Sequence, residues 1–113
     1  MNADRRIAGK VLIELLNEGS INGEISDEAH QVIGETLVHM QKSEYHQLRT
    51  QEKHEGKNTS TDKQIAICRV ALPALEQAVH AYNSDDFQEC VIKVKLAIET
   101  DGTPPKRKGR RRA

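Results

Sequence analysis

The sequence predicts an all-α protein with four helices, arranged as two helical hairpins in one small domain that spans residues 1–103. Apolar residues recur at steps of three and four in four separate segments, which is the spacing of one helix face. No segment alternates apolar and polar residues with the β-branched enrichment of a strand. A chain of 113 residues also has room for only one domain.

The first predicted helix carries its apolar face within residues 7–16. This face consists of Ile7, Ala8, Val11, Leu12, Leu15 and Leu16. Gly19 is expected to end the helix, and the Asn22-Gly23 pair predicts a tight turn after it. Ser26 then offers an N-terminal cap for the next helix, because the two acids that follow it suit the positive end of a helix dipole.

The second predicted helix begins at Ser26 and places six apolar or small residues on one face. These are Ala29, Val32, Ile33, Thr36, Leu37 and Met40. A small helical domain with few aromatic residues has a modest core, so part of this face is expected to be only half covered. Ile33, Leu37 and Met40 are therefore the candidate protein-binding residues, and the same surface is expected to form a homodimer.

A polar segment separates the second and third predicted helices. Residues 42–57 mix both signs of charge, which predicts a solvated surface, and residues 51–60 contain no apolar side chain, which predicts a loop. The segment Thr61-Asp62-Lys63-Gln64 has the spacing of a capping box. The third helix is therefore expected to begin near residue 61.

The third predicted helix has the clearest apolar periodicity in the chain. Its main stripe consists of Ile65, Cys68, Leu72, Leu75, Val79 and Tyr82 and is predicted to be core. Pro73 interrupts this stripe, but the apolar spacing continues in phase on both sides of it. The helix is therefore expected to kink at Pro73 and to continue.

The fourth predicted helix follows a stop signal at residues 83–86, ends before Gly102 and forms an antiparallel hairpin with the third. Within this hairpin, small residues alternate with larger ones. The small residues are Ala78, Cys90 and Ala97, and the larger ones are Tyr82, Phe87 and Val94. Residues 78–101 thus resemble the later part of one tetratricopeptide repeat, although a usual repeat has glycine, alanine and proline where this chain has Ala78, Cys90 and Gly102. No second copy occurs upstream, so the segment is interpreted as an ordinary helical hairpin.

Six of the seventeen Lys and Arg residues lie in the last eight positions of the chain. They are Lys106, Arg107, Lys108, Arg110, Arg111 and Arg112. Residues 1–103 have eleven Lys and Arg against seventeen Asp and Glu, so an acidic body precedes a cationic tail. Residues 104–113 are expected to be disordered, because two prolines oppose a helical start and like charges repel one another. Clustered cations release counterions on binding phosphates, which makes these six residues candidates for nucleic-acid binding.

No sequence motif indicates catalysis, a metal site or a cofactor. The chain lacks a glycine-rich phosphate loop and a Gly-x-Ser-x-Gly elbow, and its five histidines do not show zinc-ligand spacing. Cys68 and Cys90 are interpreted as small apolar core residues. Residues 7–40 fit the outline of a helix-turn-helix, but acids at the leading end of the second helix disfavour contact with phosphates.

The sequence therefore favours a non-enzymatic regulatory or adaptor protein that binds a partner protein through a helical surface. The alternative is a nucleic-acid-associated protein whose basic C-terminal arm supplies affinity for DNA or RNA. No apolar stretch has the length of a signal peptide core or a membrane span, so no membrane partner is expected. The expected location is intracellular, either cytoplasmic or, in a eukaryote, nuclear.

Overall fold

The computed structural model describes residues 3–22 and 24–103. Four helices make up most of this part of the chain: α1 (Ala3–Asn22), α2 (Asp27–Glu52), α3 (Thr59–Asn83) and α4 (Phe87–Glu99). The all-α prediction is confirmed, and the described residues include no β-strand. The predicted tail, residues 104–113, lies outside the described residues.

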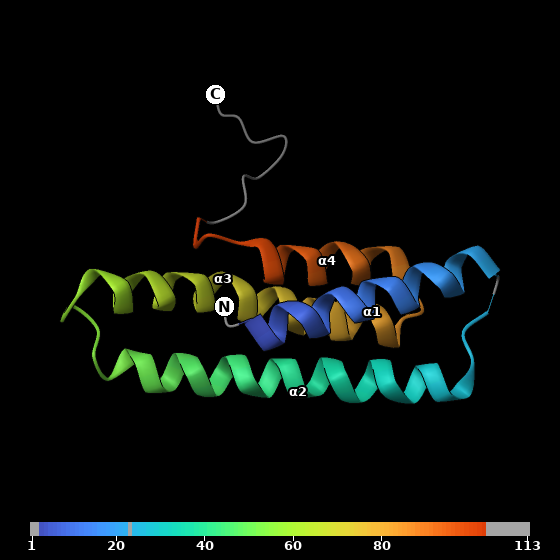
Figure 1. Cartoon of the computed structure of the whole chain (residues 1–113), viewed down its shortest axis with the longest axis horizontal. Coiled ribbons are helices and arrows are strands. Elements are labelled where there is room, and N and C mark those ends of the chain that lie inside the picture. Colours follow the sequence, from blue (N-terminus) through green and yellow to red (C-terminus); the bar gives the residue numbers. More distant parts are fainter. Residues whose placement is uncertain (1–2, 23, 104–113) are drawn as a thin grey trace, which may run out of the picture.

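Successive helices run antiparallel (Figure 1). The two longest helices, α2 and α3, lie side by side, α4 packs on α3, and α1 contacts α4 and, less extensively, α2. The α1/α3 and α2/α4 pairs are diagonal and make no close backbone approach within the described chain. Because α2 and α3 extend beyond α1 and α4 at one end, the α2/α3 turn forms the tip of a two-helix arm (Figure 1).

The main cluster of the core is built from aliphatic side chains, Met40 and Cys90. Its buried members are Leu12, Leu16, Ile33, Leu37, Met40, Ala71, Ala74, Leu75, Ala78, Ala81, Cys90, Val94, Ala97 and Ile98. Four of these are alanines of α3, and α4 contributes Cys90 and Ala97. Helices approach more closely where the side chains between them are small, so this composition suits the tight α3/α4 contact.

The ends of α1 and α2 differ in part from the sequence prediction. Gly19 does not end α1, which continues to Asn22. Gly19 is buried, and an added Cβ would clash with the side chain of Ile25, so the glycine serves close packing and not helix termination. The cap at Ser26 is confirmed, because its Oγ accepts a hydrogen bond from the Ala29 amide at 3.1 Å.

The α2/α3 connection is shorter than predicted. α2 runs to Glu52, and α3 begins at Thr59 with Asn58 as its cap. The Asn58 side chain accepts from the Thr61 amide at 2.7 Å, so the predicted capping box that starts at Thr61 is wrong. Asn58 provides the same kind of side-chain acceptor three residues earlier in the chain.

The predicted stripe of α3 is only partly core. Ile65, Cys68 and Leu75 are buried, whereas Leu72, Val79 and Tyr82 are half-buried. The stripe prediction placed the buried face too far toward α2, because α3 must also bury its alanines against α4. The predicted continuation through Pro73 is confirmed, since one helix spans the proline, whose side chain is exposed.

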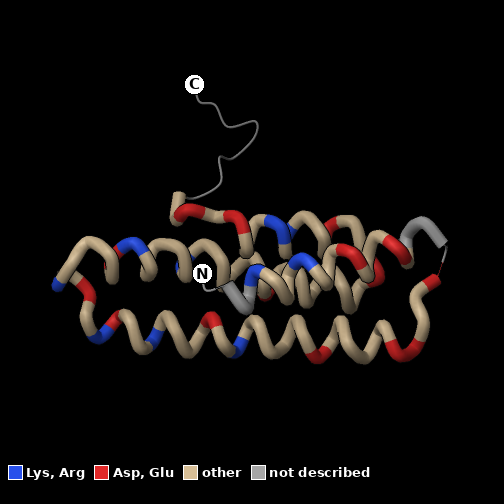
Figure 2. Tube along the Cα trace, viewed as in Figure 1, with Lys and Arg blue, Asp and Glu red and all other residues tan. Residues whose placement is uncertain are grey.

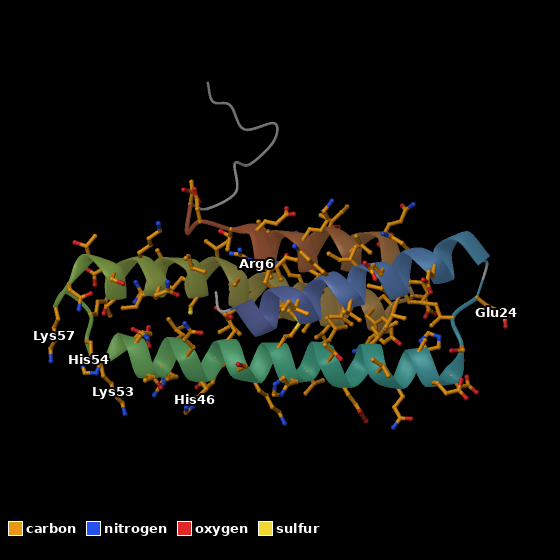
Figure 3. The ribbon with its side chains drawn as sticks, viewed as in Figure 1. Arg6, Glu24, His46, Lys53, His54 and Lys57 are labelled. Carbon is orange, nitrogen blue, oxygen red and sulfur yellow. The ribbon has the colours of Figure 1, made fainter. Side chains whose placement is uncertain are left out.

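The predicted solvated surface over residues 42–57 has one exception. Lys53, His54 and Lys57 project from the tip of the arm (Figure 3), but the Glu44 side chain is 0% exposed. Glu44 is the only charged residue that is buried in the described part of the chain. The described helices also include none that is both long and apolar enough to cross a membrane.

Leu75→Ala is expected to lower the free energy of unfolding by about 2–5 kcal/mol, because Leu75 is 0% exposed and its removal leaves a cavity. Leu72→Ala, at the half-buried position one turn earlier, should cost clearly less. Chemical denaturation of both variants measures the difference. Equal losses would contradict the burial described for α3.

Two glycines inside helices predict opposite effects of substitution by alanine. A Cβ at Gly9 would lie 2.5 Å from Ile98 Cγ2, so Gly9→Ala is expected to separate α1 from α4 and to destabilise the fold by roughly 1–2 kcal/mol. Apart from the neighbouring residues and backbone of α2 itself, no atom lies within 4 Å of a Cβ added at Gly34, so Gly34→Ala should stabilise α2 by roughly 0.5–1 kcal/mol. Thermal melts of the pair provide the measurement, and a stabilising Gly9→Ala would contradict the α1/α4 packing.

Candidate functional site

The fold separates the charges of the helical body. Residues 11–41 and 70–92 contain ten acids and no Lys or Arg. The acids are Glu14, Glu18, Glu24, Asp27, Glu28, Glu35, Glu76, Asp85, Asp86 and Glu89. The antiparallel helices bring these two ranges together at one end of the bundle, which we call the acidic end (Figure 1).

The opposite half of the bundle carries both signs of charge. Lys and Arg are found on the arm, toward the α1 start and in the middle of α4, while the acidic end shows only acids among the described residues (Figure 2). Glu24 marks the acidic end, and Lys53 and Lys57 mark the arm tip (Figure 3). The described body is therefore electrically polarised along its length.

The turn between α3 and α4 positions two acids at this end. Asp85 adopts the left-handed backbone conformation with φ of 61°, which aspartate tolerates better than most residues. Asp86 caps α4, because its Oδ1 accepts from the Glu89 amide at 3.1 Å. The Asp86 amide in turn donates to the Ala81 carbonyl at 2.9 Å, so the turn is fixed at both ends.

A pocket of about 490 Å³ opens beside this turn, between α3 and α4. Glu76 and His80 line it from α3, one helical turn apart, and Asp86 and Glu89 line it from the start of α4. Lys93 is the one Lys or Arg among the lining residues. We call this the acidic pocket. Its carboxylates can accept hydrogen bonds from a guanidinium or ammonium group.

A second depression continues the acidic pocket along α3 and α4. It has a volume of about 540 Å³ and is lined by small or apolar residues that include Ala66, Val70, Pro73, Ala74 and Leu96. Gln77 and Lys93 line both depressions, so the two adjoin, and we call them together the α3/α4 groove. Gly102 lines the end of the groove farther from the acidic pocket.

Arg69 also lines the groove, but its charge is balanced by acids of α2 and the α2/α3 turn. Its guanidinium lies 3.3 Å from a Glu52 carboxylate oxygen and 3.2 Å from one of Glu55. The hydrogen bond to Glu55, followed by that to Glu52, raises the pKa of Arg69. The cationic charge at this end of the groove is thus engaged with α2 and its following turn.

A cluster of aromatic rings packs between α2 and the α3/α4 hairpin near the acidic end. The rings of His30, Tyr82 and Phe87 lie with centroids 5.7–6.2 Å apart. The Tyr82 hydroxyl is hydrogen-bonded to His30 Nδ1 and donates to the His30 carbonyl at 3.3 Å. Burial, followed by the charges of Cys90 and Asp85, raises the pKa of Tyr82. This cluster fixes the position of the acidic pocket relative to α2.

The two cysteines are buried, as the sequence predicted, and neither forms a disulfide. Burial, followed by the charge of Asp86, raises the pKa of the Cys90 thiol to about 11, which keeps it protonated near neutral pH. A thiol in that state is a poor nucleophile. Within the described residues, no group of three or more His, Cys, Asp or Glu side chains could hold a metal ion.

The structure places the predicted protein-binding residues in the core. Ile33, Leu37 and Met40 are at most 1% exposed, so the prediction that this face is only half covered is wrong. The reason is that α1, α3 and α4 all contribute side chains to the cluster that covers them. α2 instead exposes Val32, Val38 and Tyr45, at 42–53% exposure. The homodimer therefore stays a prediction, but Ile33, Leu37 and Met40 are too deeply buried to form its interface.

The predicted nucleic-acid-binding residues, Lys106 to Arg112, lie outside the described residues. The acidic end and the α3/α4 groove were not predicted from the sequence. The signal for the first was present, because two long stretches lack Lys and Arg, but only the antiparallel topology shows that they meet. No family model, curated protein or solved structure matches this chain.

Proposed function

We propose that this protein is a non-enzymatic adaptor that binds a basic segment of a partner protein at its acidic end. The observation that carries this proposal is a pocket between α3 and α4 that is lined by three acids against one Lys, at the end of the bundle where ten acids gather. Surfaces of one sign attract partners of the opposite sign and select against partners of the same sign. A groove also selects among partners by the shape of the segment that fits into it.

The α3/α4 groove suits Lys and Arg side chains in particular. The carboxylates of Glu76 and Glu89 line the acidic pocket together with the apolar side chain of Ala81. Lys and Arg bury their aliphatic stems along apolar surface while their charged groups reach acceptors. Arginine also offers a planar fork of donors that matches a carboxylate. An extended basic peptide is therefore the ligand that we propose for this groove.

The proposal keeps the intracellular location expected from the sequence. Two free cysteines, Cys68 and Cys90, suit a reducing compartment, where thiols persist. We also propose a homodimer, and we assign its interface to the exposed apolar residues of α2 instead of the buried ones. Val38 and Tyr45 lie beside Leu72 on the outer α2/α3 surface, where a shallow pocket of about 410 Å³ forms.

The proposed function predicts that a labelled hexa-arginine peptide binds the acidic pocket. The receptor is a tail-neutral variant of the full chain, in which all six Lys and Arg residues of 106–112 are replaced by Gln. Fluorescence anisotropy at about 50 mM NaCl should show saturable binding that weakens with salt. The double variant Glu76→Gln and Glu89→Gln should weaken it roughly 2- to 30-fold, which corresponds to the loss of two surface ion pairs.

A matched control removes the same charge elsewhere at the acidic end. Glu28→Gln with Glu35→Gln changes two exposed carboxylates on α2, a helix that makes no close backbone approach to α4. This control is expected to bind hexa-arginine nearly as tightly as its parent. Equal losses in both double variants would place the attraction in the overall field of the body and not in the groove.

The second candidate function is nucleic-acid binding through the C-terminal segment. The observation in its favour is six Lys and Arg residues within positions 106–112. Residues 1–103 have a formal net charge of −6, so the helical body repels phosphates and the segment must supply any affinity. Sequence-independent contacts of this kind depend steeply on salt.

This candidate predicts that the wild-type chain binds a random-sequence DNA duplex with a strong salt dependence. Neutralising six phosphates gives a slope of log K against log salt of up to about −5. The tail-neutral variant should lose this binding and keep the wild-type melting temperature. If the variant bound duplex with a comparable affinity and slope, the helices would contain the binding site.

A further inference from the structure

The described chain ends at the mouth of the α3/α4 groove. After α4, the Gly102 amide donates to Thr100 Oγ1 at 3.1 Å, and the Thr103 amide donates to Asp101 Oδ1 at 2.9 Å. Gly102 has φ of 98°, and an added Cβ would lie 3.0 Å from the Ala66 Cβ. The chain therefore lies against α3 at this point, and Gly102 itself lines the groove.

The groove leads from this point toward the acidic pocket. Along α3, Ala66 is ten residues from Glu76 and fourteen from His80, which corresponds to roughly 15 and 21 Å of helix. Ten residues follow Thr103 in the sequence, and an extended chain covers about 3.3 Å per residue. Arg110, the seventh of them, is therefore able to reach about 23 Å, which exceeds the roughly 15–21 Å of α3 between Ala66 and the acidic pocket.

The sequence of residues 104–113 matches the two parts of the groove in order. Pro104 and Pro105 come first and favour an extended, apolar path, and the mouth of the groove is lined by Pro73, Val70 and Leu96. The three arginines at 110–112 come last and would meet the carboxylates of the acidic pocket. Lys93 lines both parts, and its positive charge would repel the basic segment. Unlike Arg69, it has no acidic partner among the described residues.

We propose that residues 104–113 occupy the α3/α4 groove of their own chain, with Pro104 and Pro105 at its mouth and Arg110 to Arg112 in the acidic pocket. The inference rests on the proposed function, since the segment occupies the pocket that we assign to a partner's basic segment. A tethered segment acts at a high effective concentration, so it competes with an external ligand of similar chemistry. The protein thereby limits partner binding at its groove and shields its own cations from nucleic acid.

A nitroxide label on Ala113→Cys tests where the segment lies. Cys68 and Cys90 are buried, so a label on the unmodified chain serves as the control for their reactivity. At low salt, the label should broaden the amide signals of Gln77, His80 and Glu89 in the full chain and leave those of Glu28 and Glu35 sharp. The broadening should disappear at high salt and weaken in the Glu76→Gln and Glu89→Gln variant.

Mixing labelled chains with isotope-enriched unlabelled chains separates the possible occupants. The proposal predicts no broadening in the enriched chains at dilute concentration, because the segment binds within its own chain. Broadening that occurs only between chains would overturn the proposal in favour of a second copy as the occupant. Uniform or absent broadening within the chain would overturn it as well.

The affinity for hexa-arginine gives an independent readout. The wild-type chain should bind this peptide about 2- to 10-fold more weakly than the tail-neutral variant, because its own segment competes. Equal affinities would contradict the inference and leave the proposed function intact. Failure of the tail-neutral variant to bind at all would contradict the proposed function itself.

Discussion

The packing of α3 between α2 and α4 is the contact on which the rest of the structure depends. α3 makes the two most extensive helix–helix contacts in the described chain, and it does so with different faces. Its alanines allow α4 to approach closely, while Leu75 and its neighbours fill the space toward α2. α1 then closes the bundle through Gly9, where a close approach to Ile98 leaves no room for a larger residue.

This packing also explains why charge and shape coincide at one site. Two helices that meet through small side chains leave a shallow channel along their outer surface, because no large residue fills the angle between them. The antiparallel order places the half of α3 without Lys or Arg beside the corresponding half of α4. The groove consequently extends from the last described residues to a pocket lined by three carboxylates, and a basic segment is the occupant that we propose for it.

The sequence predicted the number and type of the helices well, because each has a clear apolar period and a usable cap. The prediction from sequence failed where a residue type can serve two structural roles. Gly19 was expected to end α1, but it lies inside the helix and allows close contact with Ile25. Asn58 supplies the cap of α3 that was assigned to Thr61. Ile33, Leu37 and Met40 were expected at the surface because the depth of their cover depends on how α1 and α4 pack. The groove could not be predicted, since it arises only from the contact between α3 and α4.

The central claim is that the α3/α4 groove binds a basic segment, and that in the isolated chain this is residues 104–113. Amide chemical shifts of the wild type and the tail-neutral variant, compared at low salt, test it directly. The account predicts differences along the groove, from Ala66 to Ala81 on α3 and from Asp86 to Leu96 at the turn and on α4, with little change on α1 and α2. Shifts that agree throughout residues 3–103, or differ mainly on α1 and α2, would contradict it.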